Sequence, residues 1–165
     1  MLTFFLGVAL LVLGAGVAAS RRHARATDAA FQLLAVAGCA VVALAAARAL
    51  GAADAPRAAL ATSLPGGTWA FGIDPLSAVF LLAISIVGAA AVVFGAAYFT
   101  AERGHRAVWF VHTAVALLLA ALMLLVTAQA VVPFLVAWEV MAVLGYLLVV
   151  TDHESVAARR GGLLY

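Results

Sequence analysis

Residues 131–150 read VVPFLVAWEVMAVLGYLLVV, and Glu139 is the only charged side chain among these twenty residues. At about 1.5 Å per residue, a helix of this length spans roughly 30 Å, the thickness of the hydrocarbon core of a bilayer. Glu139 would then lie near the middle of the membrane. A charge at that depth costs roughly 2.5 to 3.5 kcal/mol, whereas the Val, Leu and Phe residues of the segment favour insertion by about 4 to 7 kcal/mol. The segment is therefore predicted to insert despite Glu139.

The composition of the whole chain indicates an integral membrane protein. Hydrophobic residues make up 68% of the 165 residues and charged residues only 10%, which lies outside the range of soluble domains. Nine arginines and no lysine are present, and the arginines lie at the ends of apolar runs, so a nucleic-acid partner is not expected. The single cysteine, Cys39, lies in an apolar run and is interpreted as a small buried residue. We find no Cys cluster or nucleotide-binding loop, and we predict no cofactor or metal.

The apolar runs predict an all-α, polytopic transmembrane bundle with five complete helices and the start of a sixth. Asp74 and Pro75 give two start signals for the third helix, an N-cap acceptor and a proline at the first helical position. Alternation over residues 68–73 permits a short strand just before it. The expected helices are 2–19, 29–47, 75–99, 108–127 and 131–150, with an external loop over 51–74 and the start of the sixth helix over 161–165.

The arginines also predict the orientation of the bundle. A signal peptide is the rival interpretation of residues 2–19, but the basic residues follow this apolar run instead of preceding it. With the N-terminus outside, two arginines lie outside the cell and seven lie in the cytoplasm, in agreement with the positive-inside rule. The external pair is Arg48 and Arg57, and the cytoplasmic set is Arg21, Arg22, Arg25, Arg103, Arg106, Arg159 and Arg160.

Two side chains are candidates for proton translocation. Ionisable residues inside a membrane commonly mark ion or proton paths, and Glu139 is the principal candidate. A carboxyl group moved from water into lipid holds its proton more tightly unless a cation compensates. The alternative for Glu139 is a neutral, hydrogen-bonded side chain in a helix interface. His112, about one turn inside the fourth helix, is either a polar residue hydrogen-bonded to neighbouring backbone or a weaker candidate for a proton relay.

Three segments of the chain resemble one known family. Residues 134–139 (FLVAWE) and 145–149 (GYLLV) resemble the fifth membrane helix of the antiporter-like subunits of respiratory complex I, membrane-bound hydrogenases, formate hydrogenlyase and Mrp-type cation/proton antiporters. Residues 71–78 (FGIDPLSA) are similar to the start of that family's third helix. Residues 152–154 (DHE) and 159–161 (RRG) are similar to the connection after its fifth helix in the hydrogenase branch.

This resemblance implies a proton-translocating subunit, of about fourteen or more helices, in the plasma membrane of a bacterium or an archaeon. In the family, the glutamate at the position of Glu139 pairs with a lysine on the seventh helix, and further lysines continue the path. This chain has no lysine, so it is expected to be the N-terminal portion of such a subunit. The implied partners are other membrane subunits of a redox-driven complex and the lipid bilayer, and the implied ion is a proton or sodium.

Two further classes of function remain open from the sequence. One is a stand-alone cation/proton antiporter or channel in which Glu139 binds the transported cation. The other is a structural membrane subunit in which Glu139 never titrates. The chain itself shows no redox or hydrolytic site, so whether it belongs to an enzyme depends on the complex around it.

Overall fold

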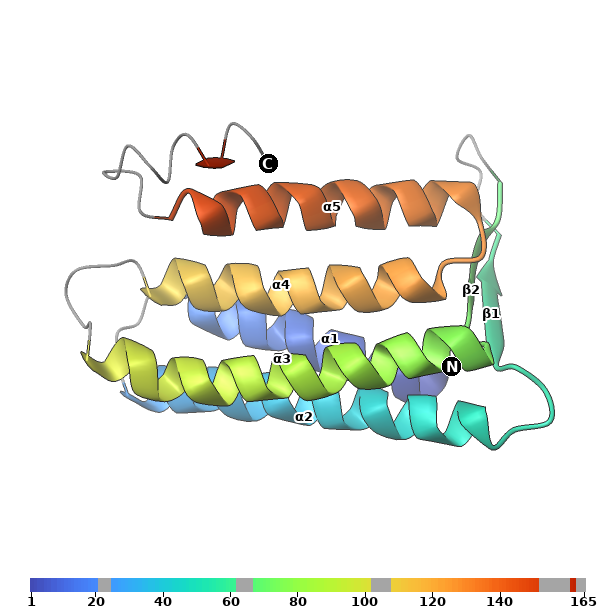
Figure 1. Cartoon of the computed structure of the whole chain (residues 1–165), viewed down its shortest axis with the longest axis horizontal. Helices are drawn as coiled ribbons and strands as arrows, with labels where there is room; N and C mark the ends of the chain where they lie inside the picture. The colour runs from blue at the N-terminus through green and yellow to red at the C-terminus, as the bar shows by residue number, and fades with distance from the viewer. Residues whose placement is uncertain (21–24, 62–66, 102–107, 152–160, 163–165) are drawn as a thin grey trace.

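The computed structural model describes residues 1–20, 25–61, 67–101, 108–151 and 161–162. Within these ranges the chain forms five α-helices and one two-stranded antiparallel sheet (Figure 1). All five helices are long and apolar enough to cross a membrane, so the chain is a multi-pass membrane protein and the predicted polytopic helix bundle is confirmed. The elements are α1 (Leu2–Ala19), α2 (Arg25–Leu50), β1 (Arg57–Leu60), β2 (Trp69–Gly72), α3 (Pro75–Ala101), α4 (Val108–Thr127) and α5 (Val131–Val149).

The second helix extends beyond the predicted range of 29–47 at both ends. Asp28 lies in its first turn and Arg48 in its last turn. An acid near the N-terminus and a base near the C-terminus of a helix both interact favourably with its dipole, so the helix continues past its apolar run. Of the predicted sixth helix, Gly161 and Gly162 are helical, and 163–165 lie outside the described residues. Most of the loop arginines on which the predicted orientation depends also lie outside the described residues.

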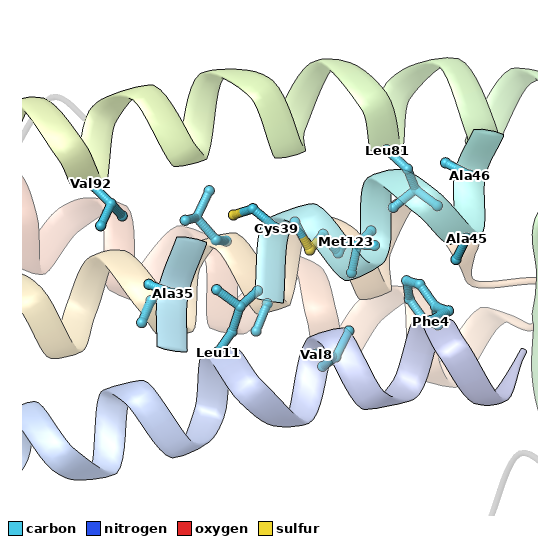
Figure 2. Packing of buried hydrophobic residues seen from close by; sticks show 14 of the residues in the cluster. Phe4, Val8, Leu11, Ala35, Cys39, Ala45, Ala46, Leu81, Val92 and Met123 are labelled. Carbon is cyan, nitrogen blue, oxygen red and sulfur yellow. The ribbon is translucent and has the colours of Figure 1, made fainter. Parts of the chain in front are cut away.

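The core lies between α1, α2, α3 and α4 (Figure 2). Alanine and glycine let these helices approach closely, as the alanine-rich sequence of α2 predicts. Among the described residues, α5 contributes nothing to this core cluster. The labelled core residues are Phe4, Val8 and Leu11 on α1, Ala35, Cys39, Ala45 and Ala46 on α2, Leu81 and Val92 on α3, and Met123 on α4.

The two strands form a hairpin that holds the connection between α4 and α5. β2 lies within the segment whose alternation permits a strand, whereas β1 was not predicted and pairs with it from Arg57↔Gly72 to Leu60↔Trp69. Ala128 bridges to Phe71, and the backbone N–H of Gln129 donates to the carbonyl oxygen of Ala70 at 2.8 Å. These contacts pair the backbone of the connection between α4 and α5 with β2 and so anchor the turn between the two helices.

Asp74 caps the N-terminus of α3, as its sequence predicts. Its Oδ1 accepts the backbone N–H of Ser77 at 2.7 Å, and this hydrogen bond holds the pKa of the carboxyl below its usual value of 3.8. We expect Asp74→Ala to destabilise the start of α3 by about 1 kcal/mol, the usual value of such a cap. Thermal unfolding of the purified protein in detergent would measure the loss.

The pH dependence of this cap provides a control. Because the folded pKa is lowered, the contribution of Asp74 is complete above 3.8 and is lost as the pH falls through the folded pKa. Asp74→Asn keeps an acceptor oxygen without a charge, so we expect it to retain most of the stability and to lose the acid dependence. Equal stabilities of Asp74→Ala and the unmodified protein above pH 5 would contradict the capping role.

Candidate functional site

Glu139 lies in the middle of α5, the helix that packs least against the rest of the bundle. About 17% of the residues in its membrane-spanning window are buried inside the chain, compared with 44% of those in α4. Its buried residues, Pro133, Ala137 and Leu144, share one narrow stripe because they are spaced by four and by seven residues. This stripe packs toward α4, and α5 also contacts β2 at its N-terminal end. Glu139 is therefore on an exposed part of the helix surface.

A pocket of about 460 Å³ lies beside Glu139, between α4 and α5. The two helices form its long walls, Val12 of α1 lines it from a third side, and Trp69 and Phe71 of β2 line it as well. Phe71 is held in place by an edge-to-face contact with Phe5 of α1, with ring centroids 5.8 Å apart. Among the described residues that line the pocket, Glu139 has the only ionisable side chain. The site is thus an apolar pocket with one carboxyl group halfway along a helix long enough to cross a membrane.

Within the described part of the chain, no ion pair or hydrogen bond joins Glu139 to another side chain. The arginine side chains that the structure describes, Arg48 and Arg57, belong to the end of α2 and to β1. A carboxylate that faces hydrocarbon without a partner is costly. Among the described residues that line the pocket, none supplies a positive charge beside Glu139.

His112 occupies a different place in the bundle. It is 7% exposed on α4, and its ring stacks on Phe31 of α2 with centroids 4.4 Å apart. From the rise of the two antiparallel helices, His112 lies on the order of 10 Å from Glu139 along the bundle axis. His112 does not line the pocket. The structure therefore does not bring the two sequence candidates together in one site.

No protein-family model and no curated protein matches this sequence. We therefore infer the chemistry of the site from the side chains that line it. Among the described residues, no group of three His, Cys, Asp or Glu side chains is arranged to hold a metal ion. A lone carboxyl group offers one negative charge and two oxygens, which suits a single proton or a monovalent cation.

The sequence identifies Glu139 but not the strand residues beside it. Trp69 and Phe71 lie in the segment whose alternation permits a strand, and the structure shows that both line the pocket. Their alternation as strand residues was the available signal, but it could not show that the strand would contact the turn between α4 and α5. Asp28, which does not line this pocket, also carries no functional signal in the sequence, because an acid at a helix start is explained by the helix dipole alone.

Proposed function

We propose that this chain is part of a proton-translocating membrane subunit of a redox-driven respiratory or hydrogenase complex, with Glu139 as a protonation site in the proton path. The observation that carries the proposal is the single carboxyl group of Glu139, which is unpaired within the described residues and lines an apolar pocket halfway along a membrane-spanning helix. The resemblance of the segments around Glu139 and Asp74 to antiporter-like subunits supports the same function. A bacterial or archaeal plasma membrane is the location that this function implies.

The mechanism is electrostatic. When a basic side chain of a neighbouring helix approaches Glu139, the ionised carboxylate is stabilised and the proton leaves. When the basic group moves away, the low-dielectric surroundings favour the neutral acid and a proton is taken up again. Conformational changes driven by redox chemistry elsewhere in the complex would move the basic group. The open face of α5 leaves room for such a neighbouring helix.

Infrared difference spectroscopy of the complete assembly in membranes tests whether Glu139 changes its protonation state. We expect a carboxyl C=O band that changes when the pH is varied between about 6 and 9, a window in which unperturbed carboxyl groups are fully ionised. The band should be missing in Glu139→Gln. Its persistence in that variant would assign the band to another acid.

The absence of any pH-dependent band from Glu139 would favour a structural subunit over the proposed function. A stand-alone antiporter or channel would give a different result. In that case the purified chain alone, reconstituted into vesicles, would exchange cations for protons without partner subunits. Full activity of the isolated chain would therefore contradict the assignment to a redox-driven complex.

A further inference from the structure

A second ionisable cluster lies at the end of the bundle opposite the β-hairpin, where α2 and α4 begin (Figure 1). The planes of the His112 and Phe31 rings are only 12° apart, so the imidazole lies flat on the phenyl ring. Asp28 precedes Phe31 by three residues and shares its face of α2. Since the His112 ring stacks on Phe31, an acid on α2 and a base on α4 lie next to the same phenyl ring at this end of the bundle.

The position of the imidazole is fixed from several sides. Phe31 is 1% exposed and covers one face of the ring. The neighbouring Thr113 hydroxyl group is 2.7 Å from the carbonyl oxygen of Trp109 and 3.4 Å from that of Ala15 on α1. These contacts hold the first turns of α4 against α1. His112 is therefore a buried side chain whose ring lies between α4 and α2.

A positive charge on the buried His112 ring would require an opposite charge close by. An imidazolium ion removed from water is costly unless an opposite charge compensates. Between residues 2 and 19, α1 has no ionisable side chain. The other described ionisable side chains at this end of the neighbouring helices are Tyr98 on α3, which is 45% exposed, and Tyr146 on α5, which is 42% exposed. Neither tyrosine supplies a negative charge near neutral pH. Among the described side chains, the Asp28 carboxylate is thus the group that can balance a proton on His112.

We propose that Asp28 and His112 form a second proton-binding pair of the transport path, placed between the end of the bundle and the membrane centre. His112 takes up a proton to form an imidazolium ion, Asp28 balances its charge, and the same proton is later released. Asp28 acts through His112 and is in this sense a positioning residue. The inference rests on the proposed function of Glu139, because it assigns the pair to the same path.

Proton transport by the complete assembly in vesicles tests this pair as a function of pH. We expect Asp28→Asn and His112→Gln each to lower transport by roughly 100-fold, at the lower end of the range for loss of a positioned proton-transfer group. The double variant should be no slower than the slower single variant, because each change disables the same pair. Tyr146→Phe removes an exposed hydroxyl group at the same end of the bundle but neither member of the pair, so it should leave the pH profile near neutral pH unchanged. Immunoblotting of each variant would confirm that the assembly is present in normal amount.

Solid-state NMR of membranes labelled with ¹⁵N-histidine gives a result independent of transport. The signal lost in His112→Gln assigns the ring, and Asp28→Asn should reduce the imidazolium share of that signal near pH 6. An unchanged ¹⁵N signal in Asp28→Asn, or additive losses of transport in the double variant, would overturn the pair. If Glu139→Gln also transports protons at the unmodified rate, the proposed function is contradicted together with this inference. If Glu139→Gln is inactive while both Asp28→Asn and His112→Gln are fully active, only this inference fails.

Discussion

Glu139→Gln in the complete assembly is expected to insert normally and to lose proton transport almost entirely. Glutamine is close to glutamate in size and is uncharged, so insertion of α5 should be no more difficult than before. The amide cannot bind and release a proton, however, and a positioned proton-transfer group is typically worth 10²–10⁴-fold in rate. We therefore expect transport to fall by roughly 100-fold, measured as acidification of vesicles that contain the assembly.

Two control variants separate the loss of a proton carrier from damage to α5. Glu139→Asp keeps an ionisable carboxyl group with a shorter reach, so it should retain part of the activity. Trp138→Phe changes the neighbouring exposed side chain but no ionisable group, and it should transport at the unmodified rate. Transport by Glu139→Gln at the rate of the unmodified assembly would rule out the proposed role, whatever the two controls show.

The helices could be predicted from the sequence because the bilayer sets both their length and their composition. An uncharged apolar run of about twenty residues has few alternatives to a membrane-spanning helix, so α1 and α4 begin and end where their apolar runs do. The second helix was longer than predicted because its ends are polar. Asp28 and Arg48 lie outside the apolar run, yet each interacts favourably with the helix dipole at its own end of α2.

The hairpin and the pocket could not be predicted because both depend on contacts between distant segments. The sequence of β1, Arg57–Leu60, has little strand character of its own. It becomes a strand because the backbone of β2 is available for pairing, and β2 is itself tied to the α4–α5 turn through Ala70 and Gln129. Local patterns contain no information on such pairings. The pocket beside Glu139 therefore became visible only when α1, β2, α4 and α5 were placed together.

The two ionisable sites also differ in how far they can be predicted from the sequence. Glu139 could be found from the sequence because a lone charge in an apolar run is conspicuous without any knowledge of the fold. The relation of Asp28 to His112 joins residues on different helices, 84 positions apart, and nothing in either segment indicates the other. Their meeting depends on how closely α1, α2 and α4 pack. That packing in turn depends on glycine positions in α1 and α2.

Gly38→Ala is expected to destabilise the bundle strongly, because α1 and α2 touch through their backbones at this point. A methyl group on Gly38 would lie 2.9 Å from the carbonyl oxygen of Gly7 and 2.9 Å from a side-chain carbon of Leu11. The oxygen is part of the α1 backbone and cannot rotate away, so the two helices must separate. Overpacking of this kind costs about 1 to 3 kcal/mol, and unfolding in mixed detergent micelles should shift accordingly.

Gly16→Ala is the matched control, since it adds the same methyl group to α1 at a position where no atom of another helix lies within 4 Å. It should leave stability unchanged or slightly raised, because alanine favours a helix over glycine. Gly7→Ala probes the same contact from the other helix, where the methyl group would lie 2.9 Å from the carbonyl oxygen of Gly38. Once one methyl group has separated the helices, the second should cost less, so the double variant should lose less than the two single losses combined. Equal stabilities of Gly38→Ala and Gly16→Ala would show that α1 and α2 do not meet at these glycines.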